Sequence, residues 1–332
     1  MHTIQRGDAV SSARIVQRQL AALLPESRPA GVGDSTLEIA GQGMDAPRLI
    51  SATMLEHGPQ QRRRVPGVAT PGFRAFLDGT QRSEVVCYIA GVPIVVGHAA
   101  AVIRERRAGR MCTWGAPLSG SRIYGPRAML ASATWATLTT AFGESLVDTS
   151  DGDADLTSHP FALRDAAIHG VQAHREQLEC RLAEQWCRGE DDPLFIDGGI
   201  SGSDAVAVSR ATIGVVKSHR TLYADGEALA SVLGLSHRER SSVFRITSPR
   251  RTTVASWYLR LRDPAGHDPM WGLIRVESAL PAAEKIDGIG DRADEVSRWI
   301  LAESTPLALP DPRWDKMVYG IRDCEEFLRA TR

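Results

Sequence analysis

Short apolar runs separated by polar and glycine-rich segments make up much of the chain, and the clearest pair lies between residues 193 and 223. One run, Leu194 to Ile196, ends on Asp197, and a second run, residues 211 to 216, ends on Lys217. Runs of this length between turn-forming residues are typical of buried strands. The pattern therefore predicts two strands joined by a polar loop, with an acid after the first and a lysine after the second.

The same arrangement occurs earlier in the chain. Residues 73 to 80, FRAFLDGT, place Asp78 and Gly79 after an apolar run, and Val85 to Ala90 forms the next run. A strand followed by an Asp-Gly turn is common and needs no function. Two carboxylates delivered by two strand ends are also the components of a divalent-cation site for phosphoryl chemistry. Asp78 and Asp197 are therefore the first candidate site residues.

The strongest helical pattern covers residues 161 to 188. Its apolar residues recur at helical spacing along one stripe, formed by Val171, Leu178, Leu182 and Trp186. Glu179 lies close to this stripe on a helical wheel of about 100° per residue. A glutamate in this position is either a solvated helix residue or a group that faces an active centre ahead of the Asp197 strand.

The remaining pattern predicts an α/β protein. We divide it into an N-terminal helix with a linker, residues 1 to 45, and one domain over residues 46 to 332. The further predicted helices cover residues 11–24, 128–145, 227–233, 293–302 and 314–330. Further strands are predicted as a hairpin over 84–96 and as single runs over 241–247, 253–261 and 272–277. The segments 25–43, 111–127, 148–155 and 307–310 are expected to be a linker, an inserted loop or hairpin, an acidic turn and a second linker.

Composition describes an ordinary globular chain. Its 332 residues are 43% hydrophobic and 24% charged, with a net charge of −1, so overall charge does not indicate nucleic-acid binding. Any such binding requires local clusters of arginine. Clusters occur at residues 62–64, 104–110 and 248–262, and we predict that they flank the site and contact phosphates without reading bases. The alternative is that they pair with the 40 acidic residues of the surface.

The cysteines and the apolar runs bear on location. Five cysteines occur without a Cys-x-x-Cys pair or metal-ligand spacing, which favours reduced and buried thiols in a cytosolic protein. No signal core is visible at the N-terminus, and no apolar run approaches the roughly 18 residues that cross a bilayer. We therefore expect a cytoplasmic protein that does not enter a membrane.

The order of these motifs resembles that of the NurA nucleases. The resemblance covers about residues 70 to 330 and rests on FLDGT, the helix with Glu179, LFIDGGISGS with IGVVKSHRTLY, and a last helix after a proline-containing linker. It implies an RNase H-like mixed sheet flanked by helices, with β insertions. It also implies manganese- or magnesium-dependent cutting of DNA by carboxylates that map to Asp78, Glu179 and Asp197. The family's last helix adds a histidine or an acid, which maps to Asp323. A HerA-type hexameric ATPase is the implied partner in DNA end processing.

Phosphodiester cleavage fits these residues on chemical grounds as well. Two cations about 4 Å apart, held by three or four carboxylates, activate the attacking water and neutralise the leaving oxygen. Lys217 is the candidate point charge on the phosphate. His219 points to the same side if the strand continues, but a surface histidine is the simpler interpretation. The segment GGISGS has neither a Gly-x-Ser-x-Gly elbow nor the Gly-Lys-Ser/Thr of a phosphate loop.

Competing hypotheses remain at this stage. The chain is either a catalytic nuclease or a subunit that keeps the fold with a weakened metal site and binds DNA or an ATPase. An Argonaute-type slicer is a further alternative, for which the chain is short. We also predict a homodimer that binds the ATPase through the amphipathic helix Ser12 to Leu24, which has no obvious core of its own. The alternative is that this helix packs on its own domain.

Overall fold

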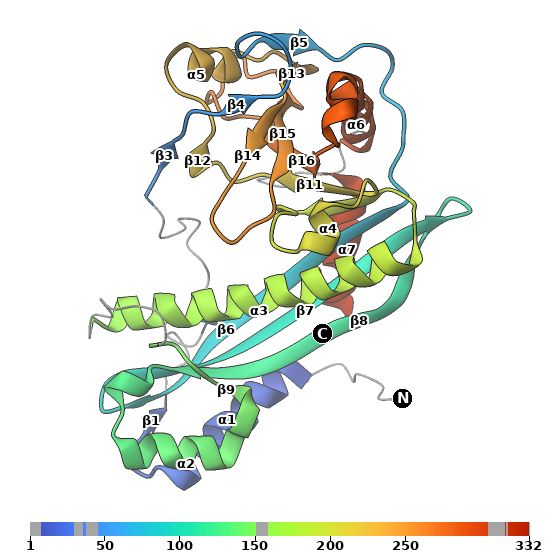
Figure 1. Cartoon of the computed structure of the whole chain (residues 1–332). Coiled ribbons are helices and arrows are strands. Elements are labelled where there is room, and N and C mark those ends of the chain that lie inside the picture. The colour runs from blue at the N-terminus through green and yellow to red at the C-terminus, as the bar shows by residue number, and fades with distance from the viewer. Residues whose placement is uncertain are drawn as a thin grey trace.

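One mixed β-sheet runs through the molecule in the computed structural model, which describes residues 8–29, 36–37, 46–150, 159–304, 316 and 318–331. Figure 1 shows the sheet passing from the upper lobe into three long lower strands. The strands follow one another across the sheet as β4 (Thr53–Met54), β14 (Phe244–Ile246), β15 (Val254–Arg260), β16 (Leu273–Ala279), β11 (Thr212–Val216), β10 (Leu194–Asp197), β6 (Ala75–Ile89), β7 (Val92–Arg107), β8 (Arg110–Gly125) and β9 (Leu146–Asp148). The predicted α/β class is confirmed.

The three long strands β6, β7 and β8 form an antiparallel meander. Ala90 and Gly91 connect the first pair, and Ala108 and Gly109 connect the second, all four with positive φ. Two-residue turns of this kind match the twist of the strands that they join. The predicted hairpin over residues 84–96 is thus confirmed, and the hairpin is longer than its apolar runs. The prediction of a loop or hairpin over 111–127 is wrong, because this segment is β8; its small and polar residues hid a strand that is partly exposed.

Strands β10 and β11 extend this meander on the side of β6. β10 lies parallel to β6, with Leu194 opposite Ala75, and β11 lies parallel to β10. β16 then pairs antiparallel with β11 and begins the upper part of the sheet. A chain that forms two parallel neighbours, here β6 and β10, must cross back to the start of the second strand. In this chain α3 (Pro160–Gly189), which follows β9 and precedes β10, makes that return. The Asp197 strand thus lies directly beside the meander.

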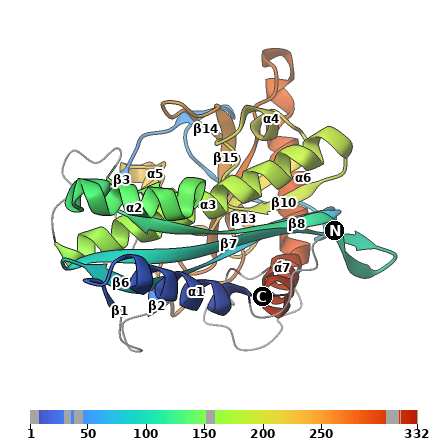
Figure 2. The same cartoon turned by 90° about the horizontal axis from the view of Figure 1, so that it is seen from below.

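Helices cover both faces of the sheet. Figure 2 shows α3 on one side of the long strands, with α1 (Asp8–Leu23) and α7 (Tyr319–Ala330) on the other. The first of these is the helix predicted over 161–188, and its predicted apolar stripe is buried. The other helices are α2 (Ser132–Phe142), α4 (Asp204–Ala207), α5 (Gly226–Leu233) and α6 (Ile289–Glu303), with 3-10 turns at Arg127–Met129, Gly143–Ser145 and Ala283–Gly288. Short strands complete the described elements: β1 (Arg28–Pro29), β2 (Thr36–Leu37), β3 (Arg48–Leu49), β5 (Arg62–Arg64), β12 (Thr221–Leu222) and β13 (Glu239–Ser241).

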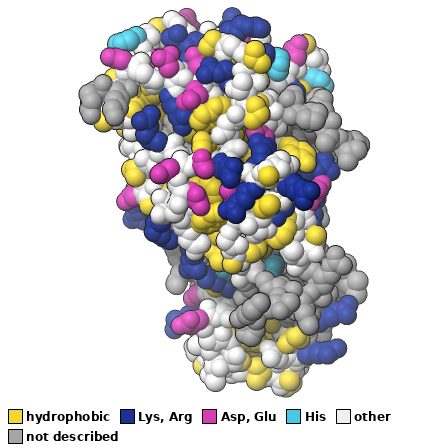
Figure 3. All heavy atoms as spheres, turned by 90° about the vertical axis from the view of Figure 1, so that its right-hand side faces the viewer, with side chains coloured by type: hydrophobic (Ala, Val, Ile, Leu, Met, Phe, Trp, Pro, Cys, Tyr) yellow, Lys and Arg dark blue, Asp and Glu magenta, His cyan; other side chains and the backbone are white. Residues whose placement is uncertain are grey.

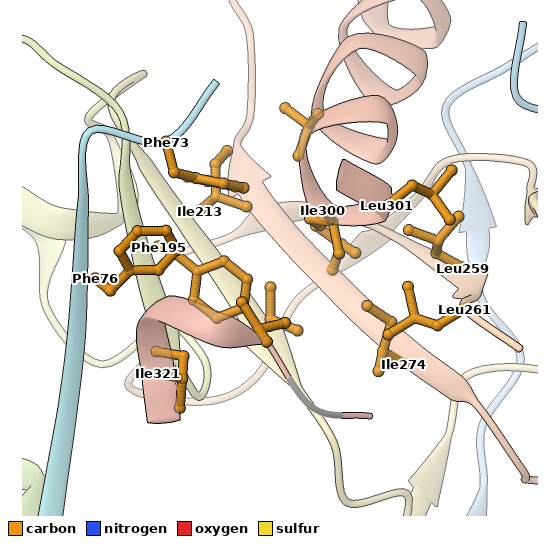
Figure 4. Packing of buried hydrophobic residues seen from close by; sticks show 14 of the residues in the cluster. Phe73, Phe76, Phe195, Ile213, Leu259, Leu261, Ile274, Ile300, Leu301 and Ile321 are labelled. Carbon is orange, nitrogen blue, oxygen red and sulfur yellow. The ribbon is translucent and has the colours of Figure 1, made fainter. Parts of the chain in front are cut away.

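The sheet has a separate apolar core on each face because side chains alternate along its strands. Phe76 and Phe195 point toward α6 and α7, where they pack with Ile300 and Ile321 (Figure 4). Their chain neighbours Leu77 and Ile196 belong to the core beneath α3. Both faces are buried over β10 and over the two ends of β6, residues 75–77 and 85–89, and these segments therefore read as continuous apolar runs.

The N-terminal helix packs on its own chain. Ala13, Leu20 and Leu24 are buried against a cluster that includes Val86 of β6 and Leu138 of α2. The premise that this helix has no core of its own is therefore wrong. β1 and β2 of the predicted linker pair with β6, and residues 30–35 and 38–43 of that linker lie outside the described residues.

Three other predictions concern segments that the structure describes only in part. The linker at 307–310 and most of the acidic turn at 148–155 lie outside the described residues. The helix predicted from residue 314 begins at Tyr319. Among the described residues, no helix is both long and apolar enough to cross a membrane. All five cysteines are free thiols, but Cys112 is exposed, contrary to the expectation of buried cysteines.

Candidate carboxylate centre

Asp197 ends β10 at the rim of a cleft of about 480 Å³. One wall of the cleft is α3, and the other is the loop from Gly198 to Ser203. Gly198 has a φ of +140°, a conformation that L-residues rarely adopt, and this turns the chain away from β10 immediately after the acid. The carboxylate is therefore fixed by the sheet and left open to the cleft by the turn.

Lys217 neutralises Asp197 from the neighbouring strand. β11 ends one residue earlier, and the Lys217 Nζ lies 2.7 Å from Asp197 Oδ2. The pKa of Lys217 is raised: burial opposes the shift, but the charge of Asp197 and its hydrogen bond outweigh it, with contributions from Asp78 and Glu325. Lys217 therefore stays charged, and its ammonium group interacts with three carboxylates.

Glu179 approaches Asp197 from α3. Its Oε1 accepts a hydrogen bond from Arg175 Nη1 at 2.7 Å, one turn earlier in the helix. The pKa of Glu179 is raised to about 7: burial is the largest cause, the charges of Asp197 and Glu176 add to it, and the charge and hydrogen bond of Arg175 oppose it. The carboxyl group lines the same cleft as Asp197. The prediction that Glu179 lies beside the buried stripe and near Asp197 therefore agrees with its position.

Gly79 makes room for this carboxylate. A Cβ at Gly79 would lie 2.3 Å from Glu179 Oε1, which is closer than atoms can approach. The backbone of β6 and the end of the Glu179 side chain are thus in direct contact. The glycine of the first Asp-Gly unit is needed for close approach of the helix, whereas the glycine of the second is needed for a turn.

Asp78 lies on the other face of the sheet. It is the fourth residue of β6, which continues for eleven more residues, so the expectation of an acid at a strand end is wrong for Asp78. Because it alternates with Leu77, it shares the face of Phe76 and α7. Burial raises the pKa of Asp78 well above its ordinary value, and Asp197, Glu179 and Glu325 add to the shift while Lys217 opposes it. Oδ1 accepts a hydrogen bond from the Gly79 amide at 2.8 Å.

The last helix contributes Glu325 to this group, whereas Asp323 is engaged elsewhere. Asp323 Oδ1 accepts a hydrogen bond from Arg104 Nε at 2.5 Å, and the same guanidinium group lies 4.7 Å from the centre of the Phe327 ring. This contact attaches α7 to β7. The helical pattern alone could have indicated Glu325, because it follows Ile321 by one turn on the buried side.

His219 takes no part in the centre. Its Nε2 lies 2.7 Å from the carbonyl oxygen of Leu273 in β16. Burial lowers the pKa of His219 to about 4, against the hydrogen bond to that carbonyl. The strand does not continue to His219, and its side chain is half-buried beside β16, so the expectation of a surface histidine is wrong.

The loop after Asp197 is held by residues that the sequence did not indicate. Glu277 of β16 is buried, and its Oε2 accepts a hydrogen bond from the Ile200 amide at 2.9 Å. The turn between β14 and β15 packs on the same loop, where the Thr252 amide donates to the Ser201 carbonyl oxygen at 3.0 Å. This turn brings Arg251 to the rim of the cleft. No motif marks these residues, because they become neighbours only through sheet pairing.

Most of the predicted arginine clusters form structural contacts. Arg63 pairs with Glu56, Arg106 pairs with Glu303, and the buried Arg260 donates hydrogen bonds to backbone carbonyls. On the face shown in Figure 3, basic side chains lie among acidic and apolar ones. The prediction that all three clusters flank the site is therefore wrong. Arg251 is the member that lines the cleft among the described residues.

The donor atoms of the centre suit a hard divalent cation. Carboxylate oxygens are the ligands that Mg²⁺ and Mn²⁺ prefer. The pKa values of Asp78 and Glu179 are raised mainly by burial and in smaller part by neighbouring carboxylates. As the side chains stand, no group of three or more His, Cys, Asp or Glu residues in the described ranges is arranged around one point for a metal ion. Lys217 and Arg175 hold one oxygen each of Asp197 and Glu179.

Comparison with known proteins adds no family to this description. The chain matches no protein-family model, and it matches no curated protein sequence. The functional argument therefore rests on the residues of the centre.

Proposed function

We propose that the chain is a metal-dependent deoxyribonuclease that hydrolyses phosphodiester bonds of DNA. The observation that carries this proposal is the meeting of Asp197 and Glu179 at one cleft, with Asp78 and Lys217 immediately behind them. The order of strands supports it, because a meander with a parallel Asp197 strand at its side is the arrangement expected of an RNase H-like core.

In this proposal the role of each residue in the reaction follows from its position. Asp197 and Glu179 would hold Mn²⁺ or Mg²⁺ at the cleft, and the ion supplies a water of lowered pKa and charge for the leaving oxygen. Lys217 keeps Asp197 in place and charged. Arg251 places a positive charge at the rim of the same cleft, where a phosphate of the substrate would lie. Asp323 has no such role in this proposal, because it holds Arg104.

A HerA-type hexameric ATPase, a homodimer, a role in DNA end processing and a cytoplasmic location belong to the same proposal. The resemblance of the motifs supports them. The buried side of α1 is not the surface for such a partner, because Ala13 and Leu20 already pack on β6 and α2. Deletion of this helix is therefore expected to damage the fold of the chain as well as any assembly.

The test is cutting of linear DNA with Mn²⁺ by purified variants. Asp197→Ala and Asp78→Ala are expected to lose activity by on the order of 10³-fold for the first and 10- to 100-fold for the second, since one removes an ion ligand and the other a supporting carboxylate. Asp263→Ala, an exposed acid on a distant loop, is the control and should cut normally. Wild-type rates from folded Asp197→Ala protein would refute the assignment.

A second candidate is a non-catalytic subunit of the same fold that binds DNA or an ATPase. The specific observation in its favour is that Lys217 and Arg175 already occupy oxygens of the two cleft carboxylates. Under this hypothesis Mn²⁺ does not bind, and the wild-type protein binds DNA without cutting it. Calorimetric titration of Mn²⁺ into the wild-type chain, run beside the cutting assay, distinguishes the two functions.

A further inference from the structure

We infer that the cleft receives one unpaired nucleotide of the DNA strand, with its base on an apolar floor beside Asp197 and Glu179. This inference rests on the proposed function, because it names the substrate class of the same site. It makes single strands and frayed ends the preferred substrates, a choice that the two acids do not make by themselves.

The floor of the cleft consists of apolar side chains to which the proposed reaction gives no role. They belong to the core beneath α3 and come from five different segments of the chain: Leu77, Ala183, Ile196, Ile200 and Val206. Close packing between these segments makes the floor a rigid surface. Preformed apolar surfaces with a few polar groups around them are typical of pockets for small ligands.

The floor adjoins both acids of the cleft. Ile196 directly precedes Asp197 in β10. Ala183 follows Glu179 by one turn of α3, a rise of about 6 Å. A nucleotide whose base rests on the floor therefore has its sugar and phosphate at the two carboxylates, where the bond would be cut.

The rim carries a positive charge that suits the next phosphate of the strand. Arg251 Nη1 lies 3.5 Å from Ser201 Oγ, in the loop that forms one wall of the cleft. The Thr252 amide holds the same turn on this loop through its 3.0 Å hydrogen bond to the Ser201 carbonyl oxygen. An apolar floor with a cation at the rim matches a base followed by a phosphate, and so favours a nucleotide over an uncharged apolar ligand.

The size of the cleft limits the occupant to about one nucleotide. Its volume of about 480 Å³ lies in the lower part of the range of roughly 300–1,000 Å³ for small-ligand pockets. The helix α4 lies beside α3 at the cleft (Figure 1) and closes it on that side. A base in a duplex can enter only after it leaves its partner and its stack, which costs least for a base that is already unpaired.

The first experiment measures the binding of thymidine to the full-length chain in EDTA by ligand-observed NMR titration. Thymidine carries no charge, so the acids do not repel it and no metal is needed. One saturable site is expected. Deoxyribose 5-phosphate, which has no base, is the control ligand and should not bind.

Two variants narrow the cleft from opposite walls. Gly202→Trp adds an indole to the loop, where an added Cβ would meet no described atom within 4 Å. Ala173→Trp adds one to the exposed side of α3. Each should weaken thymidine binding by about tenfold or more, as expected when an apolar contact is lost. Gly189→Trp has equal room for its Cβ and lies outside the cleft lining, so it is the matched control and should bind as wild type does. Undiminished binding in both cleft variants would overturn the inference.

The second experiment compares initial rates of cutting with Mn²⁺ on a single strand and on a blunt duplex that contains the same strand. The single strand should be cut about tenfold faster or more, because its bases enter the cleft without unpairing. Equal or faster cutting of the blunt duplex would overturn the inference and leave the nuclease in place.

The remaining outcomes separate the inference from the proposed function. Binding of thymidine without cutting of either DNA would refute the nuclease and leave the nucleotide cleft in place. Failure of the wild-type chain to bind thymidine would overturn the inference whether or not DNA is cut.

Discussion

The two strand-Asp-Gly units look alike in sequence and differ in almost every structural respect. Asp197 stands at the end of a four-residue strand, at a cleft, in contact with a lysine. Asp78 stands inside a strand of fifteen residues and is buried, with the hydrogen bond from the Gly79 amide to its Oδ1. The first acid has a partner of opposite charge in contact, whereas the second is buried, and three of the four charged groups that shift its pKa are carboxylates.

The difference follows from what each glycine does. Gly198 adopts a positive φ and ends the strand, whereas Gly79 stays extended and lets β6 continue into its long pairing with β7. Both conformations are open to glycine. The sequence Asp-Gly therefore indicates a place of close approach or a turn, and the surrounding sheet decides which of the two occurs.

Opposite effects on stability are the largest consequence that we expect from this comparison. Asp197→Asn leaves Lys217 without its ion pair and is predicted to destabilise the fold by about 2–3 kcal/mol, below the 3–5 kcal/mol of a fully buried pair because both groups keep some exposure. Asp78→Asn removes a buried carboxyl group that the folded chain can keep only at a raised pKa, and it is predicted to stabilise the fold at neutral pH. Urea denaturation at pH 7.5 measures both.

The pH dependence checks the cause of the second effect. The folded-state pKa of Asp78 lies above its ordinary value of 3.8, so between these two values the folded chain holds a proton that the unfolded chain has released. The stability of wild type therefore falls as pH rises through this window. The advantage of Asp78→Asn should grow with pH and vanish near pH 3.8. An advantage independent of pH would mean that packing, and not charge, is responsible.

Gly79→Ala tests the contact between β6 and α3. The added methyl group would meet Glu179 Oε1 at 2.3 Å, and the side chain of Arg175 also lies within 3 Å, so Glu179 has to move. We expect a loss of about 1–2 kcal/mol in unfolding free energy, as for an overpacked site, and weaker Mn²⁺ binding. Gly189→Ala at the end of α3 is the control, because nothing lies within 4 Å of its added methyl group. Equal stability of the two variants would show that Glu179 yields without cost.

The sequence predicted the individual helices and strands of this molecule better than the contacts between elements that lie far apart in the chain. Continuous apolar runs identified β10, β11 and the two ends of β6, residues 75–77 and 85–89, because both faces of the sheet are buried there. The helical spacing of apolar residues predicted α3 and the position of Glu179 beside its buried stripe. β8 was missed because alternation with exposed polar residues is a weak signal over a twisted, half-covered strand.

The centre itself was predictable only in part, for a physical reason. Lys217 meets Asp197 because the two residues follow consecutive apolar runs, which form neighbouring strands of the sheet. The roles of Glu277 and Arg251 follow from pairing with β16 and from the position of a distant turn, which no local pattern encodes. The exchange of Asp323 for Glu325 is a matter of helix phase, since the two residues point to different sides of α7.

The next effect in size is a pH dependence of Mn²⁺ binding, which should follow the protonation of Glu179. Its pKa of about 7 means that a proton competes with the cation in the neutral range. As pH falls from 8 to 6, the ionised fraction falls about tenfold, and the affinity for Mn²⁺ should fall by a similar factor. Glu179→Gln should bind more weakly and lose this dependence. A wild-type affinity that does not change across the range would mean that Glu179 is not a ligand.

The smallest effect separates the two neighbouring arginines of the β14–β15 turn. Arg251 lines the cleft, whereas Arg250 is exposed on the same turn and does not line it. Arg251→Ala should remove about one phosphate contact, so that log K falls less steeply with log salt concentration, by about 0.9 in slope. Raising the salt from 50 to 200 mM should therefore weaken DNA binding about threefold less in this variant than in wild type. The loss should be equal on unrelated DNA sequences, because a phosphate contact reads no bases. Arg250→Ala is the matched control and should keep the wild-type slope. Equal slopes in all three proteins would show that DNA bypasses this rim of the cleft, and equal losses in both variants would show that the turn contributes only its overall charge.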